Sequence, residues 1–242
     1  MPGVVGIIQA RMGSTRLPGK TLAPILGRPL IGVLLERVRG SAAVEEWVVA
    51  TSVDSRDDPL ARAVERLGVR VSRGSEDDVL DRFYRAAEQL HPRIVLRLTG
   101  DNPLLDGAFV DMVARRFSEQ PCDYAETTQS KTYPLGLSVE IMTFEALSQA
   151  WSEDSSLQGR EHVTPFLYRN SQRFRVVHLT GQREYSPVRC TVDTPADLEF
   201  IRQLFSHFGR TTFSWQEAVE AARQHPEWSQ INRHVEQRKV DS

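Results

Sequence analysis

The residues best suited to chemistry are concentrated in residues 9–20 (QARMGSTRLPGK). This stretch combines two arginines and one lysine with two glycines, Ser14 and Thr15. Guanidinium and ammonium groups neutralise phosphate charge, and the two hydroxyls add hydrogen-bond donors. Glycines allow backbone amides to approach phosphate oxygens closely. The stretch therefore indicates a loop that binds the phosphates of a nucleoside triphosphate, with a solvated basic turn as the alternative.

The spacing of this loop excludes two common phosphate-binding motifs. A P-loop has four residues between its glycines before Lys-Ser/Thr. Here Gly13 and Gly19 enclose five residues, and one of them is Pro18. The dinucleotide fingerprint G-x-G-x-x-G is also absent from the sequence. A triphosphate would therefore be held by a loop of another kind.

Two aspartates are candidates for holding a metal ion. Asp101 (LTGDNP) follows a strand predicted over 94–99, and Asp193 (TVDTP) follows a strand predicted over 187–192. Ligands of open α/β sheets bind at the carboxyl ends of the strands, so we expect both carboxylates at that edge. Mg²⁺ takes one or two carboxylates and completes its shell with phosphate oxygens and water. Each aspartate could instead be a plain turn or helix-cap residue.

The loop at residues 9–20 closely resembles the signature of the cytidylyltransferase family that activates 3-deoxy-manno-octulosonate and acylneuraminates. The most similar branch is the one named for spore coat polysaccharide biosynthesis. In that family the loop wraps the phosphates of CTP, and both aspartate motifs bind metal. The resemblance implies a Mg²⁺-dependent transfer of CMP from CTP to a sugar acid or sugar-like acceptor, with release of pyrophosphate.

The resemblance also assigns roles to individual residues of this sequence. The nucleotide would be bound by Ala10, Arg11, Ser14, Arg16 and Lys20. The metal would be bound by Asp101 and Asp193, which together with Arg11 and Lys20 form the implied catalytic set. The basic side chains are expected to be exposed in a cleft. Asp106 and Asp197 match no ligand position and are interpreted as first-turn helix residues favoured by the helix dipole.

The loops after the second and third predicted strands are candidates for the base pocket. In the family that this sequence resembles, these loops enclose the base and the ribose. By position this implicates Gly74, Ser75 and Arg82. Alternatively, Ser75 caps the helix predicted over 77–90 and Arg82 lies in solvent on that helix.

The acceptor site is the least readable part of the sequence. Glu140 interrupts an otherwise apolar strand predicted over 136–142, and Arg160, Glu161 and His162 begin a predicted helix. These groups could orient acceptor hydroxyls or be structural. The region departs from the octulosonate and sialate branches, so their acceptor residues are not carried over. A phosphonate or polyol phosphate acceptor, or a non-catalytic nucleotide-binding protein, remains an alternative.

Short apolar runs alternate with amphipathic stretches in the first half of the chain, which indicates a mostly parallel α/β sheet. The predicted strands are 4–9, 47–50, 69–72 and 94–99, and the predicted helices between them are 29–39, 58–67 and 77–90. We expect one Rossmann-like nucleotidyltransferase domain, 1–242, of the nucleotide-diphospho-sugar transferase type. Residues 123–186 would form a small inserted α+β lobe for acceptor binding and dimerisation. Further helices are predicted over 195–208 and 214–225.

Composition narrows the classes of partner. The 30 basic and 32 acidic residues give a net charge of -2, which offers no general reason to expect nucleic acid or an anionic membrane. Cys122 and Cys190 form no C-x-x-C motif and are expected to be idle thiols. No apolar stretch approaches the roughly 18 residues of a membrane span, and no signal-like start is present, so a cytoplasmic location is expected.

An apolar face on a predicted helix bears on assembly. Phe144, Leu147 and Trp151 recur at helical spacing within the helix predicted over 143–151. Together with the family resemblance, this favours a homodimer formed through the inserted lobe. The alternative is that the same face packs on the sheet of its own chain.

Overall fold

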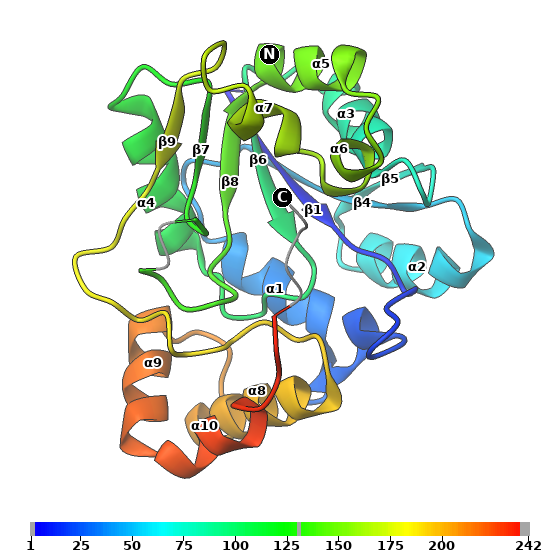
Figure 1. Ribbon diagram of the computed structural model, residues 1–242. Coiled ribbons are helices and arrows are strands. Elements are labelled where there is room, and N and C mark those ends of the chain that lie inside the picture. The colour runs from blue at the N-terminus through cyan, green and yellow to red at the C-terminus, as the bar shows by residue number, and fades with distance from the viewer. Residues whose placement is uncertain (1–2, 130–131, 238–242) are drawn as a thin grey trace.

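A seven-stranded sheet forms the centre of the computed structural model, which describes residues 3–129 and 132–237 (Figure 1). The strand order is β5-β4-β1-β6-β8-β7-β9. The strands are β1 (Val4–Gln9), β4 (Glu46–Ser52), β5 (Arg70–Gly74), β6 (Ile94–Thr99), β7 (Tyr124–Glu126), β8 (Glu140–Thr143) and β9 (Val176–His178). Strands β5, β4, β1 and β6 run parallel, whereas β8 is antiparallel to both β6 and β7. The expected mostly parallel sheet is confirmed.

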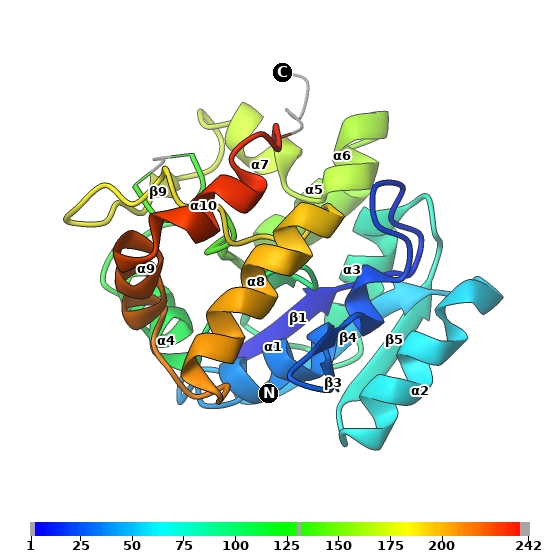
Figure 2. The same cartoon turned by 90° about the horizontal axis from the view of Figure 1, so that it is seen from below.

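Helices cover both faces of this sheet. They are α1 (Leu30–Val38), α2 (Asp58–Arg66), α3 (Val79–Glu88), α4 (Gly107–Ser118), α5 (Phe144–Glu153), α6 (Leu157–His162), α7 (Pro165–Arg169), α8 (Pro195–Phe208), α9 (Trp215–Gln224) and α10 (Pro226–Asn232). Two short 3₁₀ helices, η1 (Lys20–Leu22) and η2 (Ser55–Asp57), and a small hairpin of β2 (Pro24–Ile25) and β3 (Arg28–Pro29) complete the set. Figure 2 shows α10, which follows the end of α9, lying alongside α8.

The alternation of side chains along the central strands creates one core on each face. Ile7 and Val95 point to the core beneath α3 and α5, and their neighbours Ile8 and Leu96 point to the larger core beneath α1, α4 and α8. All four side chains are fully buried. Gly6 is needed on the second face because a Cβ there would lie 2.4 Å from the ring of Trp47. Burial on both faces explains why these strands appear as continuous apolar runs.

Several predicted elements are confirmed with their bounds, and others are corrected. The strands at 4–9 and 94–99 and the helix at 195–208 have the predicted limits. Thr194 caps that helix, and Asp197 completes a capping box. Residues 187–192 are not a strand, because their pairing is limited to one isolated bridge between Leu135 and Arg189. Pro187 lacks a backbone donor, and the amides of Cys190 and Val192 bond to the carbonyls of Leu135 and Asp101 instead.

Residues 123–186 extend the main sheet instead of forming a sheet of their own. Strands β8, β7 and β9 continue it beyond β6, and α5 and α6 of this stretch pack beside α3 (Figure 1). Ser156 caps α6, so Arg160, Glu161 and His162 end a helix where they were expected to begin one. The roles of this stretch in acceptor binding and dimerisation stay predictions.

The apolar face proposed for dimerisation is used inside the chain. Leu147 is fully buried, and the ring of Tyr84 on α3 stacks on Trp151 and Phe144 at centroid distances of 4.2 and 5.7 Å. The Trp151 indole donates a 2.8 Å hydrogen bond to the carboxylate of Asp81, which like Tyr84 lies on α3. Packing within the chain was the alternative interpretation and is correct for this face. A homodimer therefore loses this support.

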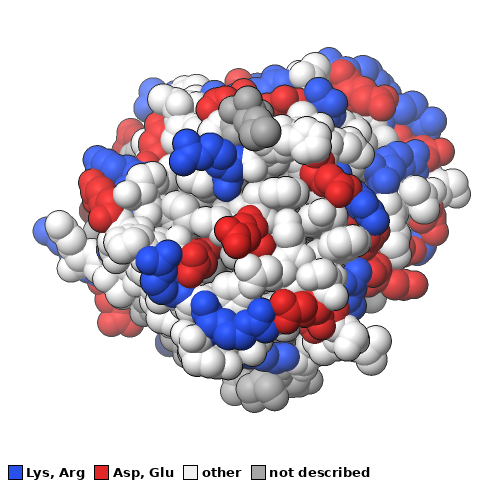
Figure 3. Space-filling view, turned by 90° about the horizontal axis from the view of Figure 1, so that it is seen from above, with Lys and Arg blue, Asp and Glu red and all other residues white. Residues whose placement is uncertain are grey.

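The surface carries both signs of charge, as the near-neutral composition predicts. Acidic and basic side chains are interspersed on the face shown in Figure 3, with neutral residues between them. None of the helices in the described residues is long and apolar enough to cross a membrane. Cys122 and Cys190 are both buried and free.

Candidate active site

The carboxyl ends of β1 and β6 open into a cavity of about 360 Å³. The lining contains most of the loop at residues 9–20 and both candidate metal ligands. It consists of Gln9, Ala10, Arg11, Gly13, Ser14, Thr15, Arg16, Lys20, Thr21, Thr99, Gly100, Asp101, Glu161 and Asp193. The loop and the two aspartates, which are far apart in sequence, are thus brought together at one edge of the sheet.

The loop is held in a fixed turn by its own backbone and by one buried acid. The carbonyl of Met12 accepts hydrogen bonds from the amides of Ser14 and Gly19 at 2.9 and 3.1 Å. Gly19 has a φ of 74°, a conformation that favours glycine. Among the described residues, no acceptor pairs with the amides of Gly13, Thr15 and Arg16. These donors are available for phosphate oxygens.

Asp57 anchors this turn, and the sequence analysis missed it. Its carboxylate is 2% exposed and accepts a 2.7 Å bond from the Met12 amide. It also accepts from the Ser52 hydroxyl and amide and from the Thr51 hydroxyl, at 2.5 to 3.0 Å. Burial would raise the pKa of Asp57, but these hydrogen bonds outweigh it and lower the pKa. Asp57 is therefore a positioning residue for the loop.

Lys20 joins the two aspartates. Its Nζ lies 2.7 Å from Oδ2 of Asp101 and 2.9 Å from Oδ1 of Asp193, and it donates to the Val192 carbonyl at 2.7 Å. Because both oxygens bond to the same nitrogen, Oδ2 of Asp101 and Oδ1 of Asp193 lie within about 6 Å of each other. The burial of Lys20 would lower its pKa, but the charges of Asp101 and Asp193 outweigh this and raise it. The expected convergence of the two carboxylates is present.

The environment of Lys20 differs from the expected exposed cleft residue. Its side chain is 11% exposed, compared with 41% for Arg11 and 25% for Arg16. Its position nevertheless shows that both aspartates face a point where a cation is stable. The described residues contain no group of three or more His, Cys, Asp or Glu able to hold a metal. A pair of carboxylates fits Mg²⁺, which takes its other ligands from phosphate and water.

Asp193 is further positioned by arginines. Arg16 and Arg189 lie 3.1 and 2.9 Å from its Oδ2, and Arg189 also binds the fully buried Asp197 at 2.7 Å. Burial would raise the pKa of Asp193, but Lys20 and these two arginines lower it. No pattern in the sequence pointed to Arg189. Asp197 lies in the first turn of α8, as predicted, and in addition holds Arg189 in place. Asp106, the N-cap of α4, does match its predicted place at a helix start.

Arg82 is buried, which corrects the alternative that it lies in solvent. It is 1% exposed, and its Nη1 donates to the carbonyl of Ser75 at 2.5 Å. Its Nε and Nη2 have no hydrogen-bond partner among residues 3–129 and 132–237. Burial, followed by the positive charge of Arg11, lowers the pKa of Arg82. A buried guanidinium with unpaired donors is costly until water or a ligand supplies acceptors for them.

Gly74 and Ser75 support Arg82 and, like Arg82, are not among the residues that line the cavity. A Cβ on Gly74 would lie 3.0 Å from the Arg82 side chain. The cap of α3 is Asp78, whose side chain accepts from the Asp81 amide, while Ser75 accepts from the amide of Asp78. The base-pocket assignment of these residues stays a prediction.

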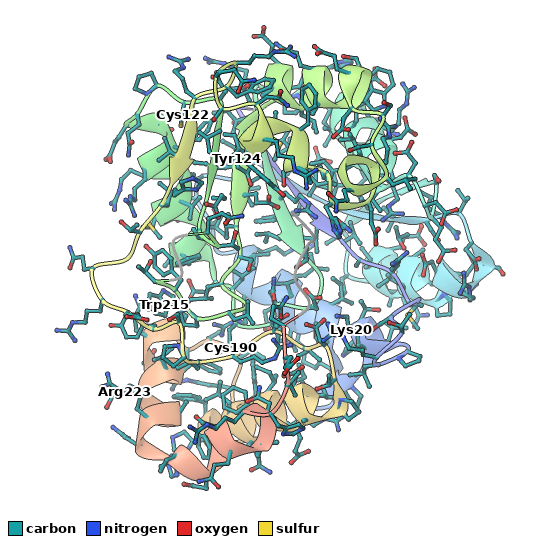
Figure 4. The ribbon with its side chains drawn as sticks, in the orientation of Figure 1. Lys20, Cys122, Tyr124, Cys190, Trp215 and Arg223 are labelled. Atoms are coloured by element: carbon teal, nitrogen blue, oxygen red, sulfur yellow. The ribbon has the colours of Figure 1, made fainter. Side chains whose placement is uncertain are left out.

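The candidate acceptor residues form internal contacts. Glu140 accepts hydrogen bonds from the hydroxyls of Tyr124 and Thr164 at 2.6 and 2.5 Å and pairs with Arg97. Arg160 binds Asp78 at 2.5 and 2.9 Å and so ties α6 to α3. Of the three neighbours at the end of α6, Glu161 lines the cavity. Lys20 and its surroundings are shown in Figure 4, at the loop between β1 and β2.

Comparison with known proteins identifies the family to which this chain is similar. The family model described as cytidylyltransferase matches residues 5–236. The spore coat polysaccharide biosynthesis protein SpsF of Bacillus subtilis is 36% identical over 236 residues, which are 94% of this chain and 97% of that protein. A 3-deoxy-manno-octulosonate cytidylyltransferase of Geobacter sulfurreducens is 36% identical over 130 residues, covering 53% of this chain and 50% of that enzyme.

A solved structure supports the same assignment. A cytidylyltransferase from Leptospira borgpetersenii superposes with a TM-score of 0.91 and 31% identity, covering 99% of this chain and 100% of that chain. The predicted fold class, a mostly parallel sheet of the nucleotide-diphospho-sugar transferase type, is thereby confirmed. Agreement extends over almost the whole chain in family model, sequence and fold. The chain belongs to the cytidylyltransferase family.

Proposed function

We propose that this chain transfers CMP from CTP to a sugar acid or sugar-like acceptor and releases pyrophosphate. The observation that carries the proposal is the convergence of Lys20, Asp101 and Asp193 beside a loop with unpaired backbone amides. The loop supplies donors for three phosphates, and the two carboxylates supply ligands for Mg²⁺. The first provides triphosphate binding and the second provides the metal site that a nucleotidyl transfer needs.

In this reaction an acceptor oxygen attacks the α-phosphorus of CTP. A bond forms between the acceptor oxygen and the α-phosphorus, and the bond from that phosphorus to the oxygen bridging the β-phosphate breaks. Pyrophosphate leaves with the electron pair, and the acceptor proton passes to solvent. Arg11, Arg16 and Lys20 stabilise the charge that builds on the leaving group. Mg²⁺ held by Asp101 and Asp193 would supply further neutralisation of phosphate charge.

The preference for CTP is proposed from the cytidylyltransferase family, with Arg82 as the residue that would select the base. Its Nε and Nη2 are unpaired donors in a buried position. Cytosine presents two neighbouring acceptors, O2 and N3, whereas uracil carries a hydrogen on N3 that would face a donor. A buried donor left without an acceptor costs about 1–3 kcal/mol, so the guanidinium would favour cytosine. Gly74 and Ser75 would form the pocket around it.

The acceptor and the setting are proposed from the relatives. SpsF is named for spore coat polysaccharide biosynthesis, and the Geobacter enzyme for 3-deoxy-manno-octulosonate. We propose a sugar acid or related acceptor, used in the cytoplasm for surface polysaccharide or glycoconjugate synthesis, by a chain that acts as a homodimer. Glu161, which lines the cavity, is the acidic side chain best placed to meet acceptor hydroxyls.

Pyrophosphate release tests this function. Each of the four ribonucleoside triphosphates is incubated with Mg²⁺ and a panel of sugar acids, polyol phosphates and phosphonates. We expect release with CTP and a sugar acid. Release with another triphosphate would refute the role of Arg82, and release with a polyol phosphate or phosphonate alone would replace the acceptor class. CTP binding without release for any acceptor in the panel would favour a non-catalytic nucleotide-binding protein.

A further inference from the structure

A second cavity, of about 760 Å³, lies between α4, the start of α9 and the segment 180–185 that follows β9. It shares no lining residue with the cavity at Lys20. In Figure 4, Trp215 marks its position at the start of α9, beside this segment. The volume falls in the range of about 300–1,000 Å³ that is typical of small-molecule sites. The nucleotidyl-transfer site proposed above does not include this cavity.

Aromatic rings form the floor of this second cavity. Phe109, Tyr133 and Trp215 are 2%, 9% and 7% exposed and pack edge to face, with interplanar angles of 79° to 83°. Because more than nine-tenths of each residue is buried, none offers an open ring face on which a nucleobase could stack. The floor is rigid and apolar, but it does not suit a second nucleotide.

The rim of the second cavity is basic. Arg115, Arg116 and Arg183 line it, and none of the lining residues in the described part of the chain is acidic, while Glu119 lies 3.8 Å from Arg115. Arg116 donates a 2.8 Å hydrogen bond to the carbonyl of Thr180. It also lies near Tyr133: burial raises the pKa of this tyrosine, and the charge and hydrogen bond of Arg116 oppose the rise without cancelling it. Arg183 is exposed and forms no ion pair within residues 3–129 and 132–237. Guanidinium groups bind carboxylate and phosphate in bidentate fashion.

We propose that the second cavity binds an anionic saccharide, a sugar that carries phosphate or carboxylate groups. The arginines would hold the anionic groups. Gln182, Gln216 and Thr180 line the same cavity and offer donors and acceptors for sugar hydroxyls. The segment 180–185 leads along the chain to Arg189, which pairs with Asp193 at the other cavity.

Calorimetric titration with two probes, glucose 1,6-bisphosphate and glucuronate, tests this site and identifies the anionic group. Arg183→Glu is the main variant because this side chain is exposed, so its replacement leaves the packing of the core unchanged. It should weaken binding of at least one probe about tenfold or more, since one lost charge-assisted hydrogen bond is worth about that factor. Arg116→Ala should do the same. Arg223→Glu, on the exposed part of α9, is the matched control and should leave affinity unchanged (Figure 4).

Two comparisons separate this site from the catalytic cavity. Binding should persist in an Arg11→Ala/Arg16→Ala variant, whose phosphate loop is impaired, and uncharged glucose should not bind. The proposal is overturned if neither probe binds, if Arg183→Glu and Arg116→Ala leave affinity unchanged, or if binding is lost in the loop variant instead. Tighter binding of CMP than of either probe in the loop variant would assign the cavity to a nucleotide.

Discussion

Replacing Lys20 by methionine is a sharp test of the ion-pair cluster. The change removes an ammonium that contacts both Asp101 and Asp193, and it keeps a side chain of similar length. The two carboxylates, 22% and 13% exposed, would then face each other without the ammonium between them, and Asp193 would keep only its contacts with Arg16 and Arg189. We expect a less stable protein whose stability becomes dependent on divalent cations.

The magnitude follows from the separation of the two carboxylates. Charges about 6 Å apart at an effective dielectric constant of about 20 repel each other by about 3 kcal/mol. For a chain of this length, about 3 kcal/mol corresponds to a melting temperature lower by roughly 6–12 °C. Millimolar Mg²⁺ should restore much of this loss in Lys20→Met, because the vacated point becomes open to a cation. The wild-type protein, whose ammonium occupies that point, should respond much less.

Thermal unfolding with and without Mg²⁺, in the absence of nucleotide, provides the assay. Arg28→Ala is a matched control, because it also removes a cation from an ion pair, with Glu36, but both side chains are 34% exposed or more. Such a pair is worth about 0–1 kcal/mol, so the control should unfold near the wild-type temperature. Equal melting temperatures for Lys20→Met and wild type, or equal responses to Mg²⁺, would refute the inferred cluster.

Three further changes test neighbouring groups. Burial would raise the pKa of Asp193, but Lys20 and two arginines outweigh this and lower the pKa. The ionised carboxylate therefore stabilises the fold above about pH 4, and this stabilisation is lost as the pH falls through the lowered pKa. In Asp193→Asn, the free energy of unfolding measured with urea should fall less steeply at acid pH than it does in the wild type. Arg82→Lys should lower the CTP-over-UTP ratio of kcat/KM about tenfold, and an unchanged ratio would remove its role in base selection. Asp57→Ala should raise the calorimetric Kd for CTP about tenfold by releasing the Met12 amide, and an unchanged Kd would separate Asp57 from the loop.

The fold was largely predictable because its signals are local. Strands β1 and β6 are dense runs of Val, Ile and Leu, and α8 begins with a Thr-Pro pair that specifies its start. Backbone hydrogen bonds between segments far apart in the chain could not be predicted from the sequence. The amides of residues 187–192 bond to Leu135 and Asp101, and no local pattern indicates such partners.

The site was predictable in its residues but less so in its contacts. The loop at residues 9–20 and the two aspartates stand out by type and by position after strands. The partners of Lys20 lie 81 and 173 residues away, so its pairing with both carboxylates could not be inferred from spacing. Asp57 and Arg189 were missed because an acid in an Asp-rich turn and an arginine in a loop are ordinary surface residues until the fold buries them. The acidic N3 position of Asp197 was the available signal for a helix cap, but it gave no indication of Arg189.

A double-mutant comparison of Asp101→Asn and Asp193→Asn, followed by pyrophosphate release from CTP, tests the central claim most directly. Both carboxylates should serve one ion and one transition state, so each single change should lower kcat about a thousandfold or more. The double variant should then be little slower than either single variant, because the two residues act as one unit. Substantial turnover in either single variant, or losses that multiply in the double variant, would contradict a shared site.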